Sequence, residues 1–325
     1  MALHVMNAAL VMCMSNKRET HMAGTIAFVT PSSAPAWQRW LVFSPVARIV
    51  IFVALAFGIG YVVHDIVALL GWTDKAASAV QHAMAQVSIE VIASVVAYVI
   101  LVRGIERRRV TELSPRTVLS SGLRGLVGGI VLFSAVVGLL WLFGCYHVLG
   151  TNAQVDWLPP LLVAGISAGV GEEIITRGVL FRITEEGLGT WWALAISALF
   201  FGAAHIFNPN ATLWSSLAIA IEAGILLALI FHVTRSLWAC IGLHAAWNLM
   251  QGTVYGIPVS GTAEKGWLVS SRTGPDWLSG GIFGAEASVV ALAACSLVSL
   301  ALLIVALRRG SIVRPFWSRR AKVSQ

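Results

Sequence analysis

The feature that most constrains the fold is a set of repeated apolar runs, each long enough to cross a bilayer. About 20 mainly apolar residues in a helix span the hydrocarbon core. Only 11% of the 325 residues are charged, against about 25% in soluble domains. We therefore predict an all-α, polytopic integral membrane helical bundle with about eight transmembrane helices. They are expected near Ala47–Leu70, Ala83–Val102, Leu123–Leu149, Leu158–Ile183, Trp191–Phe207, Leu213–Val233, Leu237–Tyr255 and Ala285–Leu307.

Arginine and lysine gather in alternate connections between these runs. Segment 103–124 and the tail after residue 307 are rich in arginine, whereas segments 151–160 and 208–214 contain no basic residue. This alternation is typical of the positive-inside rule and predicts that both termini are cytoplasmic. The expected location is a bacterial inner membrane. The net charge of +7 does not form a basic stripe with interleaved aromatic residues, so no nucleic-acid partner is expected.

The runs suggest five regions along the chain. Residues 1–46 are expected to be a cytoplasmic tail, 47–157 three accessory helices, 158–256 a catalytic core, 257–284 a non-cytoplasmic loop, and 285–325 the last helix with its basic tail. The four cysteines form no CxxC pair, so we expect small buried apolar side chains rather than disulfides or a metal site. They are Cys13, Cys145, Cys240 and Cys295.

Two adjacent acids and an arginine follow directly on the apolar segment 161–170. They are Glu172, Glu173 and Arg177. An Asp, Lys or Arg at the bilayer centre costs about 2.5–3.5 kcal/mol, so ionisable groups there indicate function. Glu173 and Arg177 are four residues apart and are expected to pair on one helix face. Glu172 lies about 100° around the helix and is left free to take a proton.

Two other predicted helices also place polar side chains in apolar surroundings. His205 lies on the fifth, and His244 and Asn248 are four residues apart on the seventh. A glutamate beside a histidine can take a proton from water, and a histidine with an asparagine can stabilise an oxyanion. Alternatively, neutral histidines and a glutamate could hold Zn²⁺, whose bound water attacks. Helix rise places His205 nearer the outer surface than Glu172, unless the fourth helix continues through Arg182 or the fifth begins deeper.

Three patterns occur in order on these apolar helices: EExxxR at 172–177, FxxxH at 201–205 and HxxxN at 244–248. Together they resemble the CPBP family of CAAX proteases and bacteriocin-processing enzymes, also called the ABI or type II CAAX prenyl endopeptidase family. The resemblance implies an intramembrane endopeptidase, built on the fourth to seventh helices, that cleaves a peptide or membrane-protein substrate at or within the lipid bilayer.

The resemblance also implies roles for the site residues. Glu172 with His205 would activate water, and His244 with Asn248 would stabilise the oxyanion. Glu173 and Arg177 would support them. Family members are often labelled metalloproteases, which makes Zn(II) a candidate cofactor, with Glu172, His205 and His244 as ligands. Activation of water without a metal remains open.

Two other functions use the same residues. A proton-coupled transporter or channel would use buried glutamate and histidine as a relay, and a bacteriocin-immunity-like protein would keep the patterns without catalysis. The missing internal repeat counts against a transporter, and the asparagine adds little to a proton relay. Glu222 either approaches the site or makes a structural hydrogen bond, and His232 is expected to be solvated at a cytoplasmic end.

Overall fold

Seven helices in the computed structural model are long and apolar enough to cross a membrane, among the residues that it describes, 27–319. The prediction of an all-α, polytopic membrane bundle is confirmed. Residues 1–26, with Cys13 and most of the predicted N-terminal tail, and residues 320–325 lie outside the described part. The seven helices are α3 (Pro45–Leu69), α4–η2 (Ala79–Val99, Ile100–Ile105), η3–η4–α5 (Pro115–Thr117, Val118–Gly122, Leu123–Leu142), α6–η5–α7–η6–α8 (Leu158–Pro160, Leu161–Ser167, Ala168–Glu173, Ile174–Phe181, Arg182–Leu188), α9–η7 (Thr190–Ala204, His205–Phe207), α10–η8–α11 (Leu213–Ile219, Ala220–Ile225, Leu226–Thr234) and α14 (Val289–Arg308).

The predicted seventh helix forms, but it is not one of these seven. It consists of α12 (Leu237–Leu249) and η9 (Met250–Val254), and it carries the buried polar side chains of His244, Asn248 and Gln251. Neighbouring helices surround it, so it does not need the all-round apolar surface of a helix that faces lipid.

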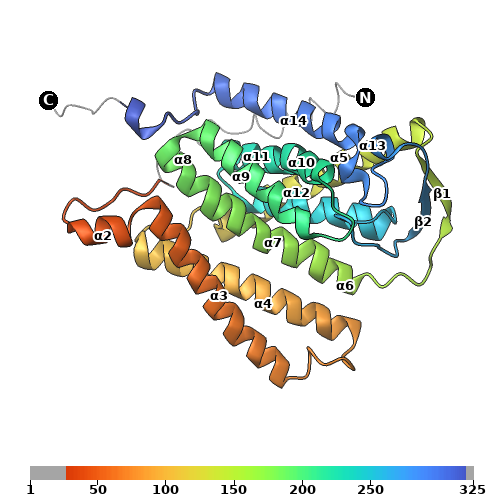
Figure 1. Cartoon of the computed structure of the whole chain (residues 1–325), viewed down its shortest axis with the longest axis horizontal. Helices are drawn as coiled ribbons and strands as arrows, with labels where there is room; N and C mark the ends of the chain where they lie inside the picture. The colour runs from red at the N-terminus through yellow and green to blue at the C-terminus, as the bar shows by residue number, and fades with distance from the viewer. Residues whose placement is uncertain (1–26, 320–325) are drawn as a thin grey trace.

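The predicted third helix is too long at its C-terminal end. The apolar run continues to Leu149, but α5 ends at Leu142 and Gly144 takes a φ of +70°, a backbone conformation that suits glycine. The chain then forms β1 (Tyr146–Thr151), which pairs antiparallel with β2 (Leu268–Arg272). Figure 1 shows this sheet at one end of the bundle, while α3 and α4 lean away from the other helices. The remaining short helices are α2 (Ala36–Leu41), α13 (Asp276–Ser279), η10 (Ala285–Ala287) and η11 (Phe316–Ser318).

Glycines set the spacing of the helices around the centre. A Cβ on Gly125 of α5 would lie 2.2 Å from the Ala239 carbonyl oxygen of α12, and one on Gly202 of α9 would lie 2.3 Å from the Ser216 oxygen of α10. Both distances are far below van der Waals contact, so only glycine allows these backbones to approach so closely.

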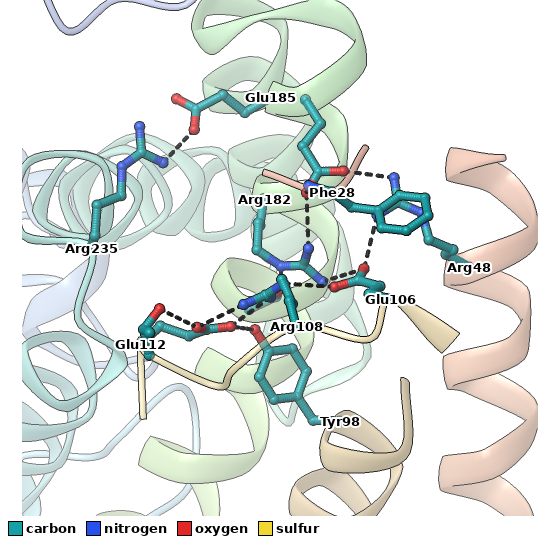
Figure 2. A network of polar contacts seen from close by, with 12 residues as sticks. Phe28, Arg48, Tyr98, Glu106, Arg108, Glu112, Arg182, Glu185 and Arg235 are labelled. Carbon is teal, nitrogen blue, oxygen red and sulfur yellow. Dashed lines mark hydrogen bonds and ion pairs between the residues drawn. The ribbon is translucent and has the colours of Figure 1, made fainter. Parts of the chain in front are cut away.

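One end of the bundle is held by a buried network of arginines and carboxylates (Figure 2). Glu106 Oε1 accepts from Arg48 Nη1 at 2.8 Å and from Arg182 Nη2 at 2.9 Å, and all three side chains are at most 3% exposed. The Glu112 carboxylate pairs with Arg108 at 2.7 Å. Burial alone would raise the pKa of Glu106, but the charges of Arg182, Arg108 and Arg48 outweigh it and hold the pKa below the ordinary 4.5.

One expectation at this end is wrong and one about the cysteines elsewhere in the bundle is confirmed. His232 is not solvated: it is 2% exposed, because Glu185 Oε1 lies 2.7 Å from its Nδ1 and Ser311 Oγ 2.9 Å from its Nε2. The three described cysteines are free and buried, as predicted for small apolar side chains.

Candidate active site

The adjacent acids lie on a helix whose backbone is irregular on both sides of them. Glu172 and Glu173 end the short α-helical segment α7, and the π-helical segments η5 and η6 flank it. Wider π turns are rare and often occur at functional sites. The helix continues through Arg182 to Leu188, which meets the condition under which His205 and Glu172 were expected at similar depth.

Glu173 is paired as the spacing predicts, and it also reaches a second helix. Its Oε1 accepts from Arg177 Nη1 at 2.8 Å and lies 2.9 Å from His244 Nδ1. Both Glu173 and Arg177 have fully buried side chains. Arg177 also donates to the carbonyl oxygens of Ala223 and Gly224 at 3.1 and 3.2 Å. Glu173 is therefore a fixed link between η6, α12 and η8.

Glu172 is held differently from its neighbour. Its side chain is 33% exposed, and its Oε2 lies 3.9 Å from His244 Nε2. Within the described residues, this buried Oε2 atom has no hydrogen-bond partner. Oε2 of Glu173 also lacks a partner among the described residues, so the two acids differ in exposure and in the use of Oε1. Glu173 is fully buried and its Oε1 is shared by Arg177 and His244, whereas the partly exposed Glu172 side chain is open to a ligand.

His205 lies where α9 changes into η7. Its Nδ1 is 2.7 Å from the Phe201 carbonyl oxygen, and its ring centroid is 4.7 Å from that of Phe201, whose ring in turn faces His244 at 6.1 Å. Within residues 27–319, no hydrogen bond or ion pair joins His205 to Glu172, although their charges interact. Phe201 thus separates the imidazoles of two candidate catalytic residues.

Asn248 keeps part of its hydrogen-bonding capacity. Its Nδ2 donates to the Ala164 carbonyl oxygen at 3.0 Å. A side-chain amide has two N–H groups and one acceptor oxygen, so one N–H and Oδ1 are left for a ligand. His244 and Asn248 are 8% and 7% exposed.

A small cavity that is partly open to the outside brings three of the predicted residues together. His205, His244 and Asn248 line it, and Glu172 is not among its lining residues. Glu222, Ser260 and Glu286 also line it. Sequence reasoning left Glu222 undecided and did not single out the other two. The only signal for Glu286 was an acid at the second position of the predicted last helix, 285–307.

The residues proposed to hold a metal do not form a metal site in this arrangement. Across residues 27–319, no group of three or more His, Cys, Asp or Glu side chains is placed to share an ion. His244 Nδ1 faces Glu173 and His205 Nδ1 faces a backbone carbonyl, which leaves the Nε2 atom of each ring as the nitrogen open to a ligand. We therefore derive no step through a metal.

Comparison with known proteins gives one match. The family model of type II CAAX prenyl endopeptidase Rce1-like proteins matches residues 154–250, the part that carries all three patterns. No curated protein matches the chain. The match confirms the resemblance found in the sequence. Residues 154–250, under a third of the chain, are thus similar to a family of peptidases, the type II CAAX prenyl endopeptidase Rce1-like proteins.

Proposed function

We propose that this protein is an intramembrane endopeptidase that hydrolyses a peptide bond at or within the membrane, with Glu172 as the general base. The observation that carries the proposal is the unpartnered Oε2 of Glu172, which faces the imidazole of His244 across 3.9 Å. That distance is too long for a direct hydrogen bond, and the proposal places the attacking water as a bridge about 2.8 Å from each atom. The family match supports the reaction class.

In the proposed reaction, Glu172 takes a proton from this water while the water oxygen attacks the peptide carbonyl carbon. The carbonyl oxygen then becomes an oxyanion. When the C–N bond breaks, Glu172 returns the proton to the leaving amine, so the glutamate is regenerated. His205 assists from the cavity wall, at the end of α9.

His244 and Asn248 are proposed to stabilise the oxyanion. Because the Glu173 carboxylate accepts hydrogen bonds, the proton of neutral His244 lies on Nδ1, and Nε2 then carries none. Donation through Nε2 therefore requires the doubly protonated imidazole, whose charge Glu172 and Glu173 balance. Asn248 donates through the N–H that Ala164 does not use. Donors placed in advance in a dry site are worth about 10²–10³ in rate.

The topology and substrate are part of the proposal. We place both termini in the cytoplasm of a bacterial cell, with 47–157 as accessory helices, 158–256 as the catalytic core and 257–284 as a non-cytoplasmic loop, because basic connections alternate with non-basic ones. The substrate class is a peptide or membrane protein. Reporter fusions at Gly71 and Gly310 test the topology, because it places these two residues on opposite sides of the membrane.

The test of the catalytic proposal compares purified wild type with Glu172→Ala and His205→Ala on the membrane peptides of a whole proteome. Both variants are expected to fold and to lose cleavage of the peptides that the wild type cuts. Cleavage at the wild-type rate by both folded variants would contradict the mechanism. Metal analysis of active protein, followed by chelation and metal addition, separates metal-free activation from a Zn(II) mechanism.

A further inference from the structure

The cavity beside the proposed catalytic residues contains two buried acids that the proposed reaction does not use. Glu222 of η8 is 1% exposed and Glu286 of η10 is 4% exposed, and both line the cavity. Glu222 Oε2 is buried and has no hydrogen-bond partner among the described residues. A buried carboxylate without a partner is costly, so this oxygen indicates a missing ligand.

Glu286 is held in place by a strained turn. Its Oε2 accepts from the Ser260 backbone N–H at 2.8 Å and from the Ser260 hydroxyl at 3.0 Å. Ser260 has a φ of +47°, which is uncommon for a residue other than glycine. Burial raises the pKa of Glu286, although these two hydrogen bonds oppose the rise. The turn thus fixes a carboxylate that also lacks a full counter-charge.

The same turn is attached to the end of the helix that bears His205. Asn208 Nδ2 donates to the Ser260 carbonyl oxygen at 3.2 Å, and Asn210 Nδ2 donates to that of Gly261 at 3.1 Å. These contacts join the turn at 260–261 to the turn at 208–210. Ser260 and Glu286 both lie outside residues 154–250, the part that the family model matches.

Among the described residues, the cavity lining holds two carboxylates, and its only bases are the imidazoles of His205 and His244, of which His244 already faces Glu172 and Glu173. Within the described residues, no lysine or arginine lines it, and Arg177 is already bound to Glu173. Apolar side chains form much of the remaining wall, including those of Ile219, Leu226 and Trp247. A long side chain with an apolar stem and a cationic head matches both properties, since lysine and arginine pack their methylene groups against apolar surfaces.

We propose that this cavity is a subsite for a lysine or arginine side chain of the peptide substrate, with Glu222 and Glu286 binding its cationic head. This proposal rests on the proposed peptidase function and adds the kind of substrate side chain that the enzyme prefers. The Glu222 and Glu286 carboxylates would act as specificity determinants, and Glu172 would remain the base.

The test measures binding in a Glu172→Gln background, so that it does not depend on turnover. The probes are labelled heptapeptides of leucine and alanine with one central Lys, Arg, Met or Glu, and their Kd values are measured in detergent micelles. The Lys and Arg peptides are expected to bind at least about tenfold more tightly than the Met peptide, and Glu222→Gln or Glu286→Gln should each reduce this preference by about tenfold. The Asp65→Asn control, whose side chain is 54% exposed on α3, should keep it.

Equal Kd values for the Lys, Arg and Met peptides would overturn the proposal, and so would a preference that persists in both glutamine variants. Glu222→Asp keeps the charge and should retain the preference, which tests the charge even if a glutamine variant fails to fold. Binding of basic peptides by a wild type that cleaves no peptide would refute the proposed function alone. Cleavage by the wild type without preference for a basic residue would refute the subsite alone.

Discussion

Oε1 of Glu173 lies 2.9 Å from Nδ1 of His244 and thereby joins the acid pair on α7 to the polar face of α12. The same oxygen accepts from Arg177 Nη1 at 2.8 Å. This oxygen therefore fixes the orientation of the His244 imidazole, and Arg177 balances the negative charge of the Glu173 carboxylate. The second imidazole nitrogen is left facing Glu172, which is the arrangement that the proposed mechanism needs.

Glu173→Gln is expected to destabilise the protein by about 3–5 kcal/mol, because it leaves the fully buried Arg177 without a counter-charge. It should also slow cleavage, since His244 loses its acceptor. Unfolding in a denaturing detergent series measures the stability. The double variant Glu173→Gln/Arg177→Met should recover much of the stability and none of the activity. A single variant as stable as the wild type would show that the pair is not needed.

The buried network around Glu106 predicts how stability depends on pH. The pKa of Glu106 is lowered in the folded protein from its ordinary 4.5. The ion pairs of Glu106 therefore stabilise the folded protein above about pH 4.5. This stabilisation is lost as the pH falls through the lower pKa that Glu106 has in the folded protein. The gap in unfolding free energy between wild type and Glu106→Gln should be large near neutral pH and shrink below about 4.5. A gap that grows on acidification would contradict this sign, and Asp65→Asn is the exposed control.

Gly202 provides a test of the close contact that positions His205. A Cβ there would lie 2.3 Å from the Ser216 carbonyl oxygen, whereas a Cβ on Gly138 of α5 would meet nothing within 4 Å. Gly202→Ala should therefore destabilise the bundle by about 1–3 kcal/mol and lower activity by shifting His205. Gly138→Ala should be neutral or slightly stabilising. Equal stability of the two alanine variants, measured by thermal unfolding, would refute the contact.

Most of the fold was predictable because apolar length alone identifies membrane helices. The error at Leu149 arose because β1 is also apolar, and hydropathy does not register the turn at Gly144. The apolar run of α12 did not show that this helix is surrounded by protein. A helix in that position can carry His244 and Asn248 because it does not face lipid. Its position depends on how the other helices pack.

The site was predictable where its residues follow helical spacing. Glu173 and Arg177 are four apart and pair as expected. Glu286 could not be placed because it reaches the cavity through a turn at Ser260, 26 residues earlier in the chain. His232 was misjudged for a related reason, since its partner Glu185 is 47 residues away. Contacts between distant segments leave no spacing signal.

Asn248→Ala tests the proposed oxyanion role. If Asn248 donates only as charge develops on the carbonyl oxygen, the variant should lose about 10²–10³ in kcat with little change in KM. Steady-state kinetics on one cleaved peptide measures this split. A raised KM with an unchanged kcat would assign Asn248 to substrate binding instead. Thermal unfolding of the variant serves as the control for the lost hydrogen bond to Ala164.

The most direct measurement is the rate at which Glu172→Gln cleaves a peptide that the wild type cuts, with Asp65→Asn as the matched control. Glutamine keeps the size of the side chain but cannot accept the proton of the attacking water. The account predicts that cleavage falls at least about 10²-fold in Glu172→Gln, with normal folding, and is unchanged in Asp65→Asn. A folded Glu172→Gln protein that cleaves at the wild-type rate would contradict Glu172 as the base.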